Sequence, residues 1–243
     1  MQEPLVLLPG LLCDARVFGP QLTALSRDMA VTVAPITRGE RVEEIASELL
    51  DVLPRKSAIA GLGLGGVVAM EILRRAPERV TRIALMDTSA LSETPQSSAD
   101  LEPLLTKARA GRLREVVAGL VHPNTLAPGP DRAEVMALIE DMADHLGPEI
   151  LFRQMRARQR RRDYQPTLRR CKVPALVLCG AHDGTAPIKH HTFLAGLIPY
   201  GKLEVIEGAG QFPVLEQPEA TNAALKAWMK QPLVLQTQVA PEV

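Results

Sequence analysis

Short apolar runs alternate with amphipathic helical stretches along most of this chain, and this alternation restricts its fold more than any other feature. The first four runs lie at Leu5–Leu8, Ala30–Ala34, Lys56–Ala60 and Val80–Met86. Helices are predicted between them at Val17–Leu25, Val42–Leu53 and Gly65–Ala76. Because the runs lack the polar alternation of a half-exposed strand, they indicate a parallel α/β sheet covered by helices on both faces.

The alternation stops near Asp87, and residues 101–168 are predicted to be mostly helical, with a loop at Pro123–Pro130. It resumes with strands at Ala175–Cys179 and Lys202–Ile206 and helices at Ile188–Leu197 and Ala220–Met229. We therefore expect a sheet of about six strands whose core spans residues 1–97 and 169–230, a helical insertion at 98–168 and a tail at 231–243. Ligands of such sheets bind beyond the carboxyl ends of the strands, so an insertion that leaves there would lie over the site.

Composition argues against several classes of function. Lys and Arg number 28 and Asp and Glu 28, and aromatic residues make up 3%, which disfavours a nucleic-acid-binding protein. No apolar run reaches the roughly 18 residues of a membrane-spanning helix. The three cysteines, Cys13, Cys171 and Cys179, are odd in number and lack metal-ligand spacing. We therefore expect a cytoplasmic protein that binds a small molecule, with no metal or other cofactor.

Glycine-rich segments follow the predicted strands at the edge where a ligand would bind. The first is Pro9-Gly10-Leu11-Leu12-Cys13-Asp14 and the second is Gly61-Leu62-Gly63-Leu64-Gly65-Gly66. A third region has two parts, Gly180-Ala181-His182-Asp183-Gly184 and Gly208-Ala209-Gly210-Gln211-Phe212-Pro213.

On these segments the chain resembles the α/β-hydrolase superfamily, and in particular its small esterase-like members with a helical cap. The resemblance runs from about Leu5 to Met229. It implies that the first segment is the oxyanion loop and that the second is the nucleophile elbow, G-x-S-x-G in the family. It also implies that Cys179-Gly180-Ala181-His182-Asp183 is the acid turn and that residues 208–219 correspond to the segment of the catalytic histidine.

The sequence departs from this family at two catalytic positions. Gly63 stands where the family has its nucleophilic serine, and Gln211 stands where it has its histidine, so only the acid, Asp183, remains. Glycine has no oxygen to form an acyl-enzyme, and glutamine has no basic nitrogen near neutral pH. Standard serine hydrolysis is therefore expected to be absent or vestigial, at about the 10³–10⁴-fold enhancement that an oxyanion hole and binding alone supply.

The remaining groups still predict a function. The resemblance implies that the backbone N–H groups of Leu11 and Leu64 bind a carbonyl oxygen, while Asp183 activates a water beside Gly63 and Gln211 orients it. We expect a protein that binds a small apolar carbonyl or ester-like compound under the cap, with non-covalent hydrolytic, lyase-type or isomerase-type activity. Three alternatives stay open: a non-catalytic binding or interaction protein, an esterase inactivated or redesigned by substitution, and a dinucleotide-binding protein.

Several further side chains are candidates for the site. Cys13 is a conceivable nucleophile, although a free cysteine is more often buried packing. Asp87 ends its strand, and is either a second acid or, as we favour, a turn cap with Thr88 and Ser89. His122 is either a lid residue of the site or a surface-loop residue, and His182 is more simply structural. His190 and His191 are predicted to be exposed on their helix.

Two motifs support competing interpretations. Residues 61–66 also fit the dinucleotide fingerprint G-x-G-x-x-G, and Asp87 follows at the expected distance, but the fingerprint normally opens the first strand–helix unit. Eight arginines fall between Arg153 and Arg170, which would suit an acidic partner or a phosphate. We favour a solvated helix face balanced by acids such as Glu134, Glu140, Asp141 and Asp144.

Overall fold

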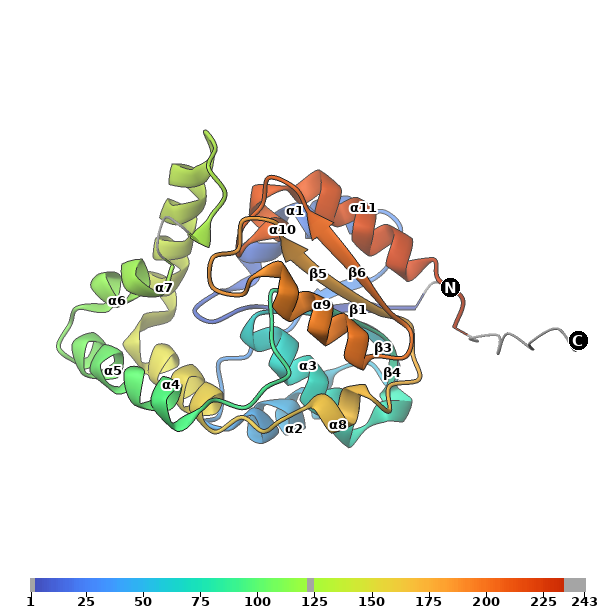
Figure 1. Cartoon of the computed structure of the whole chain (residues 1–243), viewed down its shortest axis with the longest axis horizontal. Helices are drawn as coiled ribbons and strands as arrows, with labels where there is room; N and C mark the ends of the chain where they lie inside the picture. Colours follow the sequence, from blue (N-terminus) through green and yellow to red (C-terminus); the bar gives the residue numbers. More distant parts are fainter. Residues whose placement is uncertain (1–2, 122–124, 234–243) are drawn as a thin grey trace, which may run out of the picture.

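The computed structural model describes residues 3–121 and 125–233. Its centre is a parallel sheet of six strands, as the sequence predicts, and their order is β2-β1-β3-β4-β5-β6. The strands are β1 (Leu5–Leu8), β2 (Val31–Val33), β3 (Ser57–Leu62), β4 (Val80–Met86), β5 (Ala175–Gly180) and β6 (Gly201–Ile206). Figure 1 shows the sheet with helices in front of it and behind it.

The four central strands β1, β3, β4 and β5 are buried on both faces because their side chains alternate between two separate cores, whereas the edge strands β2 and β6 are partly exposed. Leu5 and Leu7 of β1 belong to one core, and Val6 and Leu8 belong to the other. The first core lies under α1 (Gly19–Leu25) and α11 (Pro218–Met229), and it includes Trp228. The second lies under α2 (Val42–Val52), α3 (Leu64–Arg75), α8 (Gln165–Leu168) and α9 (Ile188–Leu197). This arrangement explains why the sequence shows no polar alternation along the strands.

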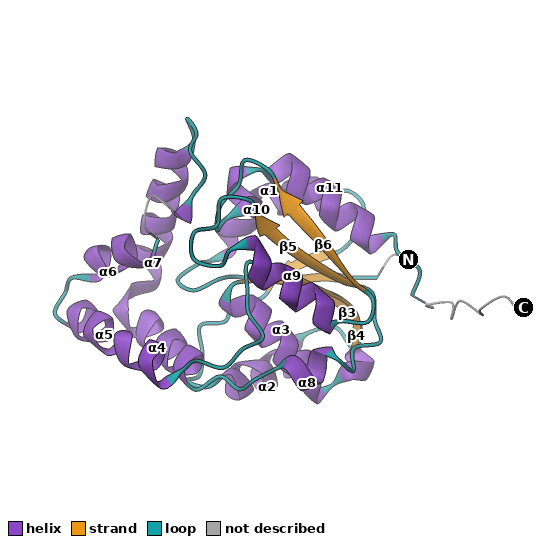
Figure 2. Ribbon diagram, in the orientation of Figure 1, coloured by secondary structure: helices purple, strands orange, loops and turns teal. Residues whose placement is uncertain are grey.

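A helical segment joins β4 to β5 and extends away from the sheet (Figures 1 and 2). It consists of α4 (Pro95–Asp100), α5 (Glu102–Arg109), α6 (Leu113–Leu120) and α7 (Arg132–Gln159). Helix α7 is interrupted at Gly147, whose φ of 78° is not helical, next to Pro148. The helical region begins earlier than the predicted Leu101, and α8, which we expected within it, packs against α3 of the core.

Proline and glycine account for the other differences from the predicted elements. The predicted helix Val17–Leu25 is divided into the 3₁₀ turn η1 (Ala15–Phe18) and α1, where Pro20 stands in the first turn. A second 3₁₀ turn, η2 (Pro77–Arg79), follows α3. The last predicted helix begins at Pro218, after the short α10 (Pro213–Glu216).

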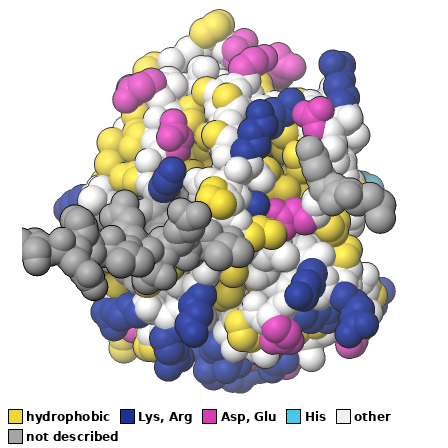
Figure 3. Space-filling model, turned by 90° about the vertical axis from the view of Figure 1, so that its right-hand side faces the viewer, with side chains coloured by type: hydrophobic (Ala, Val, Ile, Leu, Met, Phe, Trp, Pro, Cys, Tyr) yellow, Lys and Arg dark blue, Asp and Glu magenta, His cyan; other side chains and the backbone are white. Residues whose placement is uncertain are grey.

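The surface of the described residues carries both signs of charge. Figure 3 shows acidic and basic side chains spread over the face turned to the viewer, in keeping with a formal net charge of zero. Among residues 3–121 and 125–233, no helix combines the length and the hydropathy that a bilayer crossing requires.

Candidate active site

The turn between β3 and α3 has a geometry that requires glycine at two of its positions. A Cβ on Gly61 would lie 2.3 Å from the carbonyl oxygen of Gly65, and a Cβ on Gly65 would lie 2.2 Å from that of Leu8. Gly63, at the tip, has φ 52° and ψ −114°, but the nearest heavy atom to a Cβ there, apart from its chain neighbours, would be the Cα of Gly10 at 3.9 Å. A side chain therefore fits at Gly63 at the expense of backbone strain alone.

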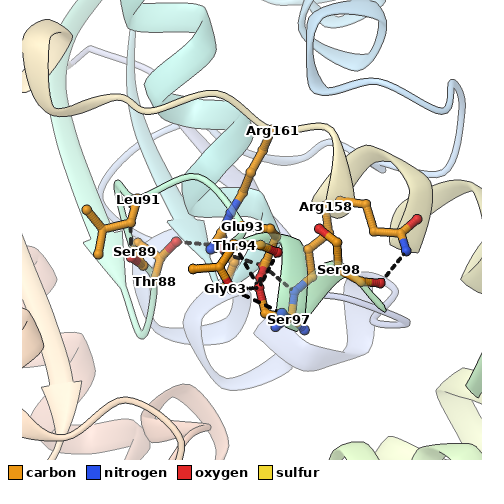
Figure 4. A network of polar contacts seen from close by, with 11 residues as sticks. Gly63, Thr88, Ser89, Leu91, Glu93, Thr94, Ser97, Ser98, Arg158 and Arg161 are labelled. Carbon is orange, nitrogen blue, oxygen red and sulfur yellow. Dashed lines mark hydrogen bonds and ion pairs between the residues drawn. The ribbon is translucent and has the colours of Figure 1, made fainter. Parts of the chain in front are cut away.

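Two hydrogen bonds attach this tip to the end of β4. The Gly63 N–H donates to the carbonyl oxygen of Met86 at 2.8 Å. The Thr88 hydroxyl donates to the carbonyl oxygen of Gly63 at 2.6 Å (Figure 4). The sharp turn at residue 63 is thus held in place by its neighbouring strand, as a nucleophile elbow is.

A cavity of about 450 Å³ opens above this turn. Its floor is formed by the strand ends and includes Leu11, Gly63, Leu64 and Gln211. Its other side is apolar and comes from the helical segment, with Leu101, Val117, Leu120, Val121 and Ile139. Four of the predicted site residues therefore share one cavity, of a size that suits a small organic ligand.

The predicted oxyanion donors lie on the floor of this cavity. Leu64 is the first residue of α3. A backbone N–H at this position has no acceptor within the helix and lies at the positive end of the helix dipole. The loop that carries Leu11 is held by α7, because the Leu12 N–H donates to the Gln154 side-chain oxygen at 2.8 Å. Gln154 is fully buried and also donates to the carbonyl oxygen of Ile36. Sequence reasoning missed this residue because it lies 142 positions from its partner.

The backbone around Gln211 is fixed by a carboxylate and by the helical segment. Glu216 accepts from the N–H groups of Gly210 at 3.0 Å and Phe212 at 2.9 Å. The Gln211 N–H donates to the carbonyl oxygen of Thr125 at 2.8 Å. The side-chain oxygen of Gln211 is buried and has no hydrogen-bond partner among the described residues. Gln211 therefore lines the cavity with a side-chain oxygen that is covered and unpaired.

The structure places Asp183 behind the cavity wall rather than on it. One carboxylate oxygen accepts from the Thr185 N–H at 2.8 Å, the Thr185 hydroxyl at 2.6 Å and the Ala186 N–H at 3.1 Å. The other oxygen is buried and has no partner among the described residues. Asp183 is 5% exposed and is not among the cavity-lining residues, whereas Asp87 is.

Our interpretation of Asp87 as a turn cap is wrong. Its side chain is buried and accepts from the N–H of Gly180 on β5 at 3.3 Å, so it spans two strands instead of closing its own turn. Its backbone has a φ of 43°, uncommon for a residue with a side chain. Burial, and then the nearby charge of Asp183, raise the pKa of the Asp87 carboxyl well above its ordinary value.

The prediction that His191 is exposed is also wrong, because its side chain is fully buried on α9. Burial lowers the pKa of His191, although the charge of Asp183 acts in the opposite direction. Donor atoms of Asp87, Asp183 and His191 all lie within 4.8 Å of one another, so these three are the described residues with the spacing to hold a metal ion. Position 191 falls on the core side of an otherwise ordinary helix, which no local sequence signal reveals.

The other histidines and the cysteine are placed differently. His190 is exposed, as predicted, and lines the cavity. His182 is exposed, and its backbone N–H donates to Ala209. His122 lies outside the described residues. Cys13 is 2% exposed, lies in the core and not at the cavity, and has a pKa raised to about 12 by burial and by Asp14. The structure therefore gives no support to Cys13 as a nucleophile.

Five of the eight arginines of the basic stretch pair with acids among the described residues, in partial agreement with the balanced face that we favoured, but the acids differ from those we named. Pairs join Arg156 to Glu102, Arg158 and Arg161 to Glu93, Arg160 to Glu40 and Arg162 to Glu43. The basic residues therefore connect the end of α7 to the segment before α4 and to the start of α2.

The sheet and the sharp turn at Gly63 agree with the similarity of this chain to known proteins. A sequence model described as the Alpha/beta hydrolase family matches residues 5–224. The chain belongs to the α/β-hydrolase family. The glycines of residues 61–66 are those of its strand-to-helix turn, and contacts inside the protein account for Gly61, Gly65 and Gly66 without a dinucleotide.

Two relatives are named as an enol-lactonase and an esterase. The chain is 26% identical over 201 residues to "3-oxoadipate enol-lactonase 2" of Acinetobacter baylyi, covering 78% of this chain and 71% of the relative. It is 28% identical over 203 residues to a pimeloyl-[acyl-carrier protein] methyl ester esterase of Aromatoleum aromaticum, covering 75% and 77%. It spans 55% of the length of an uncharacterized protein of Mycobacterium tuberculosis, to which it is 28% identical.

Solved structures share the fold. A thermophilic esterase from Thermogutta terrifontis superposes with a TM-score of 0.85 at 24% identity, covering 93% of this chain and 89% of that one. An enol-lactonase from Burkholderia xenovorans superposes with a TM-score of 0.83 at 24% identity, covering 95% and 92%. At this identity the likeness is one of fold alone.

Proposed function

We propose that this protein binds a small, largely apolar carbonyl compound, such as an ester or a lactone, and acts on it without forming an acyl-enzyme. The observation that carries the proposal is the tip of the elbow, where Gly63 adopts the strained turn of a nucleophile but offers no nucleophile. The relatives named as an enol-lactonase and a methyl ester esterase support an ester-like ligand.

The floor of the cavity provides the groups for water-assisted chemistry. The N–H groups of Leu11 and Leu64 hold the carbonyl oxygen and stabilise the negative charge that develops there. A water beside Gly63 attacks the carbonyl carbon, and the side-chain oxygen of Gln211 accepts a hydrogen bond from it. Lyase-type or isomerase-type chemistry would use the same oxyanion site with a proton taken from the ligand.

Asp87 is better placed than Asp183 to take that proton. Asp87 lines the cavity next to Gly63, and a raised pKa makes its carboxylate a stronger base. Asp183, from behind, contributes the charge that helps to raise this pKa and so acts as a positioning residue. We therefore transfer the predicted role of the base from Asp183 to Asp87.

Turnover of a panel of aryl esters and lactones tests this proposal. We expect Asp87→Asn to lower the rate about 10²–10⁴-fold, the usual contribution of a general base, with the exposed Asp100→Asn as control. We expect Asp183→Ala to lower it less and to shift the acidic limb of the pH–rate profile. An Asp87→Asn variant with the turnover of the parent would exclude this base, and an unchanged pH profile in Asp183→Ala would exclude the positioning role.

The double substitution Gly63→Ser with Gln211→His tests the site assignment itself. The space around Gly63 accepts a Cβ, so a serine there reaches the cavity. We expect the double variant to gain esterase activity through a transient acyl-enzyme, visible as a burst with a p-nitrophenyl ester. Each single variant is the control, since neither restores both nucleophile and base.

A second candidate function is ligand binding without turnover. It is favoured by the same two positions, because Gly63 and Gln211 lack both reacting groups of the family. Calorimetric binding of an ester by a parent protein that hydrolyses none of the panel above the buffer rate would establish this function instead.

A further inference from the structure

Two arginines of the basic stretch, unlike their neighbours, face the cavity. Arg158 lies near the end of α7 and Arg161 follows it, and both line the cavity that contains Gly63 and Gln211. Figure 4 shows the two guanidinium groups near Glu93, beside the elbow. Arg160 and Arg162, from the same run, instead form exposed pairs with Glu40 and Glu43.

The charges on this wall do not cancel. Arg158 contacts Glu93 at 2.8 Å and Arg161 contacts the same oxygen at 3.1 Å, so one carboxylate serves two guanidinium groups. The other oxygen of Glu93 accepts from the Ser97 hydroxyl at 2.6 Å. Hydrogen bonds from Arg158 and Ser97 overcome the effect of burial and keep the pKa of Glu93 below its ordinary value. The wall therefore carries one net positive charge.

Arg161 is the less well satisfied member of the pair. Its side chain is 14% exposed, and its Nε–H is buried without an acceptor among the described residues. A buried donor of a charged group that lacks a partner is costly, and a carboxylate is the acceptor that matches a guanidinium best.

The acidic residue on the cavity floor does not neutralise this wall. The charges that act on the Asp87 carboxyl are those of Asp183 and Glu216, and neither arginine is among them.

We propose that Arg158 and Arg161 form an anion subsite, so that the ligand is a carbonyl compound whose apolar chain ends in a single carboxylate. The charge balance favours a carboxylate over a phosphate monoester, since one net positive charge matches one negative charge and the rest of the cavity is mainly apolar. This inference rests on the proposed function only in placing the carbonyl end of the ligand at Leu11 and Leu64.

Calorimetric titration with two matched esters tests the subsite. Monomethyl adipate carries an ester and a carboxylate, and dimethyl adipate replaces the carboxylate by a second neutral ester. We expect the parent protein to bind the monoester at least tenfold more tightly, a difference that corresponds to 1.4 kcal/mol. Equal affinity for the two esters, or binding of neither at millimolar concentration, would overturn the subsite.

Variants from the same arginine run provide the controls. Arg161→Gln is expected to lower the affinity for the monoester at least tenfold and to leave the affinity for the diester unchanged. Arg160→Gln should alter neither, because its side chain is paired with Glu40 outside the cavity. If Arg161→Gln does not fold, as judged by circular dichroism, Arg158→Gln takes its place, since its side chain is 36% exposed. Unchanged binding of the monoester by the folded variant would overturn the proposal.

Turnover separates this inference from the proposed function. If the parent protein binds the monoester more tightly but hydrolyses neither compound, the anion subsite is supported and the catalytic proposal is overturned. If the parent protein hydrolyses ester substrates but binds both probes equally, the catalytic proposal is supported and the anion subsite is overturned.

Discussion

The Thr88 hydroxyl donates a 2.6 Å hydrogen bond to the carbonyl oxygen of Gly63, and this bond connects the residue after β4 to the tip of the elbow. Thr88 is 6% exposed, so its hydroxyl group has little access to water. The relationship explains how a glycine, which is free to adopt many conformations, is kept in one strained turn.

Removal of this hydroxyl should loosen the elbow. Thr88→Val keeps the shape of the side chain, and we expect it to lower the free energy of unfolding by about 0.5–1.5 kcal/mol, because one hydrogen bond to the Gly63 carbonyl is lost while that from the Gly66 N–H at 3.1 Å remains. Urea denaturation measures the change. Thr192→Val, which removes an exposed hydroxyl bonded to Ile188 within α9, is the matched control and should change stability by less than about 0.5 kcal/mol.

The three glycines of the elbow should respond differently to alanine. Gly63→Ala adds a Cβ in open space at a φ of 52°, and we expect a loss of about 1–3 kcal/mol from strain alone. Gly65→Ala places its Cβ 2.2 Å from a backbone oxygen, so the strand and helix must separate and the loss should be larger. Thermal unfolding compares the two. Equal losses would mean that residue 63 is as confined as residue 65.

The cysteines should be inert in the folded protein. Cys13, Cys171 and Cys179 are all buried, and burial raises the pKa of Cys13 and of Cys179 to about 12. At pH 8 we expect almost no reaction with a thiol reagent such as Ellman's reagent over minutes, and three equivalents after denaturation. Rapid modification of one thiol in the native protein would contradict this placement and would reopen the question of Cys13.

The sequence was sufficient to predict the parallel sheet because its central strands are buried runs, and runs such as Leu5–Leu8 contribute side chains to two cores. The elbow was predictable too, since glycines are needed at the spacing where backbone segments approach each other closely. Gly61 and Gly65 are there because any Cβ would collide with a neighbouring strand or turn.

What the sequence could not provide were contacts between distant segments. Asp87 was placed in the wrong role because its partner, the Gly180 N–H, lies on another strand. His191 gave no local sign of burial, and the acids that balance the arginines come from residues 40–43, 93 and 102 rather than from the same helix. Burial and charge partners of this kind are set by tertiary packing.

The buried carboxylate of Glu71 predicts how stability depends on acid. Burial opposes its ionisation, but hydrogen bonds from Arg74 at 2.8 Å and Arg75 at 2.9 Å outweigh that effect and hold the pKa of Glu71 below its ordinary value. A folded pKa below the unfolded value of about 4.3 means that the ionised group stabilises the protein fully above that pH. The contribution is lost as pH falls through the folded pKa.

Glu71→Gln should therefore destabilise the protein in a pH-dependent way. We expect a loss of about 1–3 kcal/mol at pH 7, because the two arginines lose a charged acceptor, and a smaller difference from the parent as the pH falls below about 4. Urea denaturation between pH 3 and pH 7 measures both, with the exposed Glu78→Gln as control. A difference that stays constant across this range would mean that Glu71 is not ionised in the folded protein.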